Sequence, residues 1–335
     1  ILMRSWHKGA FLLILLLCCL AGAVCLSLFT GSSSLSLGEL YHALQAGDKT
    51  DTTYRIFLYV RLPRTLAAIF AGAALAVSGA IIQAVLNNSL ASPNIIGVNS
   101  GAGFCALLAA SLAPTAWAAV PLAAFVGALA TSLFIYALAA KTGASRITLV
   151  LAGVAVSSIL SAGIDVLTIL FPDDVVGATG FMVGSFAGVT MTALKPAAVL
   201  IVIGLVLALV FSYDLNVLSL GEEIAASLGM RVAVVRFLFI VIASLLAGSA
   251  VSFAGLLGFI GLIVPHICRR FAGGDNRLVI PCAALLGAVF ALVCDALGKW
   301  VFAPFELPVG IILALLGGPF FLFLLLKGGR GKIYD

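Results

Sequence analysis

The stretch RLPRTLAAIFAGAALAVSG, residues 61–79, places two arginines and a proline at the start of an apolar run of alanine, glycine and leucine. Extended to residue 86, this run is long enough for a helix that crosses the roughly 30 Å hydrocarbon core of a bilayer. The whole chain of 335 residues is 63% hydrophobic and 9% charged. Soluble domains average about 45–50% apolar and 25% charged residues, so the sequence predicts an all-α integral membrane protein.

Apolar runs recur along the entire length and leave no room for a separate soluble domain. They predict about ten transmembrane helices in a single polytopic domain, residues 1–335. The predicted spans are 10–29, 64–86, 95–112, 117–140, 147–171, 195–212, 232–252, 257–271, 278–297 and 307–326. The first span exceeds the apolar core of a signal peptide and is interpreted as a retained helix. The third and eighth are short, so we expect them to be broken or sheltered inside the bundle.

The distribution of basic residues predicts the orientation. With the N-terminus inside, twelve of the 18 basic residues fall on the inner side, which follows the positive-inside rule and places both termini in the cytoplasm. The twelve are Arg4, Lys8, Lys141, Arg146, Arg231, Arg236, Arg269, Arg270, Arg277, Lys327, Arg330 and Lys332. The other six are Lys49, Arg55, Arg61, Arg64, Lys195 and Lys299. Topology thus explains the net charge of +5 without a nucleic-acid partner.

A weak internal repeat relates two of the spans. AGAALAVSG (71–79) and AGSAVSFAG (247–255) are identical at four of nine positions, and each follows a helix start that contains arginine. One span enters the membrane from outside and the other from inside. Inverted repeats of this kind are typical of transporters with alternating access, although four matches among alanine and glycine are weak support.

Two acidic residues lie within predicted spans, where an acid ordinarily marks an ion relay or a substrate site. Asp165 follows Ile147 by about 27 Å at 1.5 Å per residue, so we expect it near the outer water. Asp295 ends its span and has Lys299 four residues later as an ion-pair partner. Both positions disfavour a secondary transporter driven by an ion gradient, which remains the alternative function.

Sequence motifs for catalysis and metal binding are missing. The chain has no G-x-x-x-x-G-K-[ST] loop, no H-E-x-x-H and no neighbouring serine, histidine and acid set. Its seven cysteines form no C-x-x-C pair and have no histidine at zinc-ligand spacing. We therefore expect a non-enzymatic chain without a metal or cofactor of its own, and the energy for transport must come from elsewhere.

One predicted cytoplasmic loop, residues 213–236, contains the signals of a short helix. Acidic residues in its first turn and a glycine at its end suit the helix dipole and the C-cap. The residues concerned are Gly221, Glu222, Glu223, Ala225, Leu228 and Gly229. Because an acidic start disfavours binding to anionic lipid, we expect this helix to insert into a groove of a partner protein.

Four stretches carry a family resemblance: RLPRTLAAIFAGAALAVSGAIIQAVLNNSLASPNIIGVNSGAG (61–103), LSLGEEIAASLG (218–229), GFIGLIVPHICRR (258–270) and ELPVGIILALLGGPFFLFLL (306–325). Together and in this order they resemble the FecCD/BtuC-type permeases of ABC importers for ferric siderophores, haem and cobalamin. The resemblance implies a ten-helix type II importer permease in the bacterial plasma membrane, paired with a second copy as a homodimer or heterodimer. It also implies two ATPase subunits, which bind ATP and Mg²⁺, and an extracytoplasmic substrate-binding protein.

The resemblance further implies roles for individual residues. Arg61, Arg64 and Lys299 match basic residues that meet acidic residues of the docked binding protein. The helix within 218–229 matches the coupling element that inserts into the ATPase. The translocation path would run between the two copies. It would be lined by the tenth span and by four residues of the fifth, Ser157, Ser158, Ser161 and Asp165.

The residues alone leave alternatives open. Arg61 and Arg64 can equally extend to lipid headgroups or cap the entry of the helix whose first turn Pro63 sets. A structural or assembly membrane protein is a third class of function, but it would not need the outer arginines and the acidic inner helix together.

Overall fold

The computed structural model describes residues 2–30, 45, 51–113, 116, 119–141, 146–301 and 305–328. Across these residues the regular structure is helical, and none of them forms a strand. Three of the cations used to predict the orientation, Lys49, Arg330 and Lys332, lie outside the described residues. The all-α prediction is confirmed for the described part of the chain.

Each of the ten predicted spans contains a helix. The helices are α1 (Leu2–Phe29), α4 (Leu62–Leu86), α5 (Val98–Leu112), α6 (Ala119–Lys141), α7 (Arg146–Leu170), α9 (Met191–Val210), α12 (Val232–Ala254), α13 (Ile260–Ala272), α14 (Asn276–Trp300) and α15 (Val309–Gly328). Seven helical segments of the described chain are long and apolar enough to cross a membrane. As expected, α5 and α13 are shorter, with 15 and 13 residues.

The second predicted span begins earlier than expected. Helical structure runs without a break over Thr52–Leu86, through α3 (Thr52–Ile56), a π-helical turn (Phe57–Arg61) and α4. Pro63 has no N–H to donate to the carbonyl four residues before it, and the wider π turn directly precedes it. The prediction of a start at residue 64 was wrong because the arginines that interrupt the apolar run are accommodated inside the helical bundle.

The described chain also contains a 3₁₀ turn (Pro93–Ile96) and three further short α-helices. The helix α8 (Pro172–Val183) lies in a region to which the sequence assigned no element. It starts at a proline, which suits a first helical turn, and it ends at Gly184 with φ +84°. The other two, α10 (Ser212–Ser219) and α11 (Glu222–Ser227), lie in the predicted inner loop.

The helix α4 forms the centre of the bundle. In the continuous helical segment Thr52–Leu86, 83% of the 18-residue apolar stretch that could cross a membrane is buried. The helix α4 packs against α12, α13 and α14. A Cβ atom at Gly72 would lie 2.7 Å from the carbonyl carbon of Gly287, so these backbones touch with no room for a side chain. The Ser78 hydroxyl donates to the Ala243 carbonyl at 2.7 Å, which joins α4 to α12. These are the two helices of the weak repeat, whose inverted relation stays a prediction.

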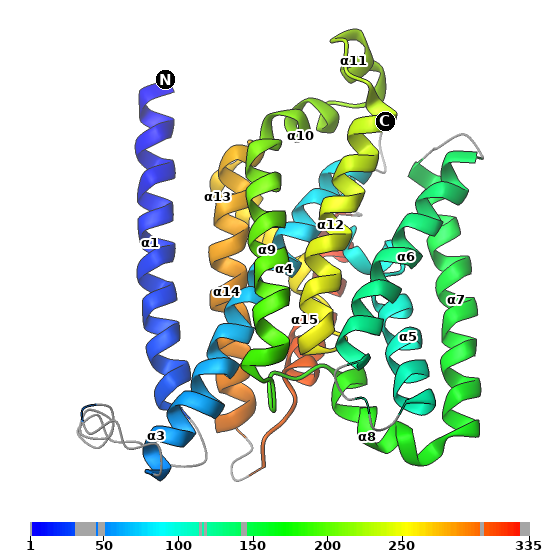
Figure 1. Ribbon diagram of the computed structural model, residues 1–335. Coiled ribbons are helices and arrows are strands. Elements are labelled where there is room, and N and C mark those ends of the chain that lie inside the picture. The colour runs from blue at the N-terminus through cyan, green and yellow to red at the C-terminus, as the bar shows by residue number, and fades with distance from the viewer. Residues whose placement is uncertain are drawn as a thin grey trace.

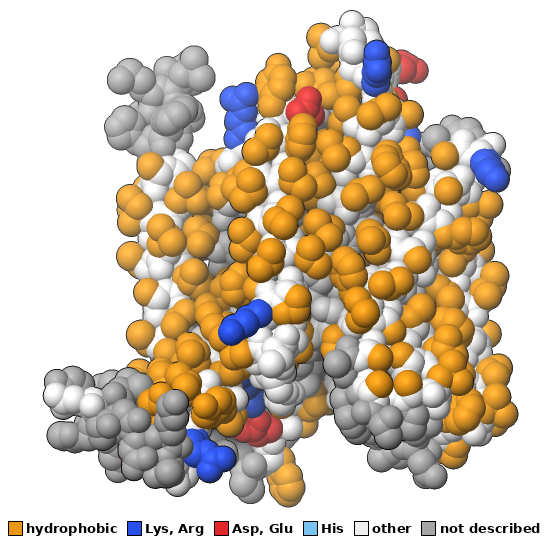
Figure 2. Space-filling view, in the orientation of Figure 1, with side chains coloured by type: hydrophobic (Ala, Val, Ile, Leu, Met, Phe, Trp, Pro, Cys, Tyr) orange, Lys and Arg blue, Asp and Glu red, His pale blue; other side chains and the backbone are white. Residues whose placement is uncertain are grey.

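The bundle has two distinct ends. Figure 1 shows α11 projecting at the end where α1 begins, while α3 and α8 lie at the opposite end. Hydrophobic side chains cover most of the face in Figure 2, and most charged side chains gather towards the two ends. A belt of apolar surface between charged ends is the arrangement expected of a chain that spans a membrane along this axis.

Candidate functional site

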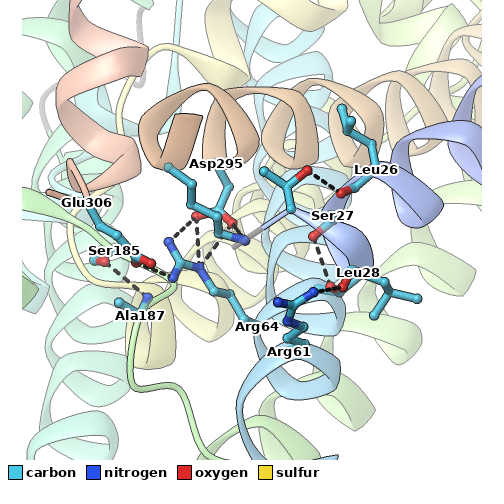
Figure 3. Close-up of polar contacts among 12 residues, drawn as sticks. Leu26, Ser27, Leu28, Arg61, Arg64, Ser185, Ala187, Asp295 and Glu306 are labelled. Carbon is cyan, nitrogen blue, oxygen red and sulfur yellow. Dashed lines mark hydrogen bonds and ion pairs between the residues drawn. The ribbon is translucent and has the colours of Figure 1, made fainter. Parts of the chain in front are cut away.

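Four charged side chains meet where α4 begins, α14 ends and the segment before α15 passes them. We call Arg64, Asp295, Lys299 and Glu306 the four-charge cluster (Figure 3). Arg64 binds both carboxylate oxygens of Asp295, Nη2 to Oδ1 at 3.0 Å and Nε to Oδ2 at 3.1 Å. Its third nitrogen, Nη1, donates to Glu306 Oε2 at 2.6 Å. Lys299 Nζ lies 2.7 Å from Asp295 Oδ2.

Burial differs strongly within the four-charge cluster. The side chain of Asp295 is 1% exposed, those of Lys299 and Arg64 are 6% and 10% exposed, and that of Glu306 is 35% exposed. A bidentate arginine–carboxylate pair is among the stronger charge-assisted contacts. Since an unpaired buried charge is costly, each member of the inner three depends on the other two. Glu306 is the one member that water also solvates.

The predicted pair between Asp295 and Lys299 is confirmed, at spacing i,i+4 on α14. The pairing of Arg64 with Asp295 joins residues 231 positions apart, and no local pattern indicates it. Glu306 was missed as well, because it lies between two apolar segments and has no periodic neighbour of opposite charge. Sequence reasoning therefore found the Asp295–Lys299 pair and missed the contacts of Arg64 with Asp295 and Glu306.

Arg61 lies outside the four-charge cluster, although the sequence groups it with Arg64. Its Nη1 donates to the Leu28 carbonyl of α1 at 2.5 Å (Figure 3). One turn away, the hydroxyls of Ser27 and Thr65 hydrogen-bond at 2.9 Å. Measured over the whole residue, backbone included, Arg61, Arg64 and Lys299 are each less than 10% exposed. The expectation of freely exposed rim cations is thus corrected for this single chain, while a docking role stays a prediction.

The inner segment, residues 221–229, folds into the short helix that the sequence predicts. Glu222 and Glu223 occupy the first turn of α11, and Gly221 precedes it with φ +114°. At the other end the Met230 N–H bonds to the Ala225 carbonyl and the Gly229 N–H to the Ala226 carbonyl, at 3.0 and 2.9 Å. This is the Schellman pattern, with glycine in the left-handed region, φ +84°.

The inner segment is anchored on one side and open on the other. Ala225 is fully buried, and Glu222 Oε1 lies 2.5 Å from Nη2 of the buried Arg236 of α12. Ile224 and Leu228 are 50% and 64% exposed. Two exposed aliphatic side chains four residues apart form the start of an apolar face on a helix that projects from the bundle.

The structure separates the four residues predicted for a translocation path. Ser158, Ser161 and Asp165 follow each other at spacings of three and four on the exposed face of α7. Ser157 faces the chain's own interior, and its hydroxyl is buried without a hydrogen-bond partner among the described residues. Only Ser158, Ser161 and Asp165 therefore share one surface.

The described residues contain no group of three histidine, cysteine or acidic side chains placed to hold a metal ion. Cys268, Cys282 and Cys294 are buried in α13 and α14, whereas Cys18, Cys19 and Cys25 lie on the exposed side of α1. Each of these cysteines is free.

Comparisons with known proteins agree with the helical membrane fold described above. The model of the FecCD transport family matches residues 15–327. The Fe(3+)-citrate import permease YfmD of Bacillus subtilis (strain 168) is 38% identical over 309 residues, 92% of each chain. The hemin transport permease HmuU of Yersinia pestis is 37% identical and covers 95% of this chain and 94% of its own. The cobalamin import permease BtuC of Halobacterium salinarum is 39% identical over 79% of this chain and 72% of its own.

A solved structure shares the fold. It is described as an inward-facing conformation of a metal-chelate type ABC transporter, and it superposes with a TM-score of 0.81 at 29% sequence identity. The superposition covers 94% of this chain and 98% of that chain.

Proposed function

Because this chain belongs to the FecCD transport family and is a permease subunit of an ABC importer, we propose that its cargo is a metal chelate of the ferric siderophore, haem or cobalamin class. The family match along nearly the whole chain carries the proposal. The chain itself catalyses nothing, and a separate ATPase that binds ATP and Mg²⁺ supplies the energy. In this proposal all ten predicted spans cross a bacterial plasma membrane, with the inverted repeat relating two of them and both termini in the cytoplasm.

A second permease copy completes the conduit in this proposal. The α7 face with Ser158, Ser161 and Asp165 also exposes Ile159, Val166 and Ile169, each more than half accessible in the single chain. A large chelate needs a wide conduit without tightly binding ligands, and a surface of small hydroxyls among aliphatic side chains meets that need. The inner-facing Ser157 supports the wall rather than lining it. The partner copy is identical or a close relative.

The inner segment is the proposed contact with the ATPase. Its anchored side, Ala225 and the Glu222–Arg236 pair, transmits force to α12, while Ile224 and Leu228 enter the partner's groove. An apolar helical face in a groove is a common mode of recognition between proteins. ATP-driven closure of two ATPase subunits then rocks the two permease copies between inward-open and outward-open states, and differential affinity for the two states supplies the bias.

The four-charge cluster and Arg61 are the proposed docking surface for the substrate-binding protein. Arg64 is held by two acids, and only Glu306 is partly exposed. A carboxylate of the binding protein can therefore replace Glu306 on Arg64 while Asp295 keeps its place. Charge pairs at such a rim steer association and determine register. Under this exchange Glu306→Gln removes a competitor and strengthens docking several-fold, whereas Arg64→Gln weakens it, as surface plasmon resonance at two salt concentrations would measure.

Reconstitution tests the proposed function directly. The full chain, a cognate ATPase and a binding protein are placed together in liposomes, and uptake of labelled ferric siderophore, haem and cobalamin is measured. We expect uptake of one cargo class that requires ATP and the binding protein. Uptake that persists without ATP and follows a proton or sodium gradient would establish the secondary-transporter alternative instead.

A further inference from the structure

A cavity of about 710 Å³ lies among five helices, and none of its lining residues belongs to α7. Its walls come from α5, α6, α8, α9 and α12 and from the loop between α8 and α9. Binding sites for small molecules typically enclose about 300–1,000 Å³. Since α8 lies at the end opposite α11, the cavity is at that end of the molecule (Figure 1).

The cavity walls are mainly apolar. Leu107, Phe125, Met182, Leu200 and Phe253 line it from five different helices. On α9 the lining extends from Thr190 to Leu200, which corresponds to about 15 Å of helix at 1.5 Å per residue. This depth equals half of the roughly 30 Å hydrocarbon core of a bilayer, that is, one leaflet. Water would be a poor occupant of so apolar a space.

Two serines of α12, Ser249 and Ser252, also line the cavity. The Ser252 hydroxyl donates to the Ser249 carbonyl at 2.8 Å, and Ser249 has no accessible surface, so its hydroxyl does not reach the cavity space. Neither serine therefore offers a free donor to an occupant, which suits a hydrocarbon chain.

One end of the cavity favours an anion. The N-terminus of α9, with the hydroxyls of Thr190 and Thr192, borders the cavity there, and helix N-termini favour phosphate groups. Lys195 is exposed one turn further along α9, next to the lining residue Pro196. Among the described residues no carboxylate lies within ion-pair distance of Lys195. Positive charge and hydroxyls thus stand at the rim of an apolar space that is one leaflet deep.

We propose that this cavity binds one acyl chain of a membrane phospholipid as a structural lipid. The chain fills the apolar space between α5, α6, α9 and α12. The phosphate lies at the N-terminus of α9, where Lys195 neutralises it. The site shares no residue with the predicted translocation path, and the lipid holds α9 to α5 and α6.

Native mass spectrometry of the purified full chain tests the site, with added dioleoyl phosphatidylglycerol as the probe. We expect one phospholipid to remain bound after detergent exchange. Ala193→Phe, which fills the cavity, should lower its retention at least tenfold. Ala198→Phe is the matched control, since Ala198 is on the same helix, equally half-buried and outside the lining. Lys195→Gln should lower retention several-fold, because it removes the charge and leaves the cavity intact.

Equal retention in Ala193→Phe and Ala198→Phe would overturn the proposal, and so would retention of a transported chelate in place of the lipid. A fluorescence measurement covers the case in which the filled variant does not fold. Phe125→Trp places a reporter in the cavity, and Phe134→Trp places one on the exposed face of the same helix. A phosphatidylglycerol with brominated chains should quench the first reporter in a saturable way at low mole fraction, and the second only in proportion to its mole fraction. Proportional quenching of both reporters would refute the site.

Discussion

The four-charge cluster and the inner segment each depend on an arginine–carboxylate contact, but the surroundings of the two contacts are opposite. In the four-charge cluster the carboxylate of Asp295 is 1% exposed and binds two cations. In the inner segment the carboxylate of Glu222 is 43% exposed and lies on one buried arginine. Desolvation makes the first contact a condition of folding, whereas the second leaves a helix at the surface whose apolar face is free for a partner. The same chemistry therefore buries a charge network at one end and leaves an apolar helical face exposed at the other.

Removing the Asp295 carboxylate should cause the largest loss of stability among the variants compared here. Asp295→Ala leaves Lys299 buried without a counter-ion and deprives Arg64 of its bidentate partner, so we expect a loss of about 3–5 kcal/mol of unfolding free energy. Thermal and denaturant unfolding of the purified chain in mixed micelles would measure it. Glu306→Gln is the matched control in the same cluster and should cost less than about 1 kcal/mol, since Glu306 is partly solvated. Equal losses in both variants would mean that burial does not distinguish the two acids.

Gly229→Ala tests the backbone of the inner segment. A Cβ at Gly229 meets no atom within 4 Å, so its cost comes from the left-handed backbone alone, about 1–2 kcal/mol. Gly180→Ala in α8 is also free of contacts, but its backbone is helical, and it should gain roughly 0.5–1 kcal/mol. Unfolding measurements that find the two variants equally stable would show that the Schellman turn does not constrain this segment.

Glu222→Gln should have a smaller effect on stability. The contact to Arg236 is lost as an ion pair, but a glutamine side chain keeps a hydrogen-bond acceptor, and the partly exposed position limits the cost to about 1 kcal/mol or less. The comparison with Asp295→Ala in the same unfolding assay measures the influence of burial on one type of contact. A loss as large as that of Asp295→Ala would contradict the distinction between the two regions.

Leu228→Ala should leave the unfolding free energy nearly unchanged, because the side chain is 64% exposed in the single chain. If the inner segment binds the ATPase, the same substitution should lower ATP-driven uptake about tenfold or more, as truncation of an interface hot spot does. Leu17→Ala on the exposed side of α1 is the matched control and should change neither quantity. Normal uptake in Leu228→Ala would remove this residue from the proposed contact.

Local sequence patterns were sufficient where the interaction itself is local. Hydrophobic runs located each of the long helices, a spacing of four located the Asp295–Lys299 pair, and acids followed by a glycine located α11. Contacts between residues far apart in the sequence could not be predicted from such local patterns. The helical start at Thr52 was missed because charged residues normally end an apolar span, and here Arg61 and Arg64 find partners on α1 and α14.

Composition and hydrophobic runs alone therefore specified a helical membrane chain and located its long helices, and the order of short motifs indicated its family. The fold alone determined which charges are buried together, which serines of α7 share a surface and where an apolar cavity remains. The physical reason is the range of the forces involved. Helix formation and lipid exposure depend on residues within one or two turns of each other, whereas the burial of Arg64 with Asp295 and Glu306 depends on segments more than 200 residues apart that meet only after packing.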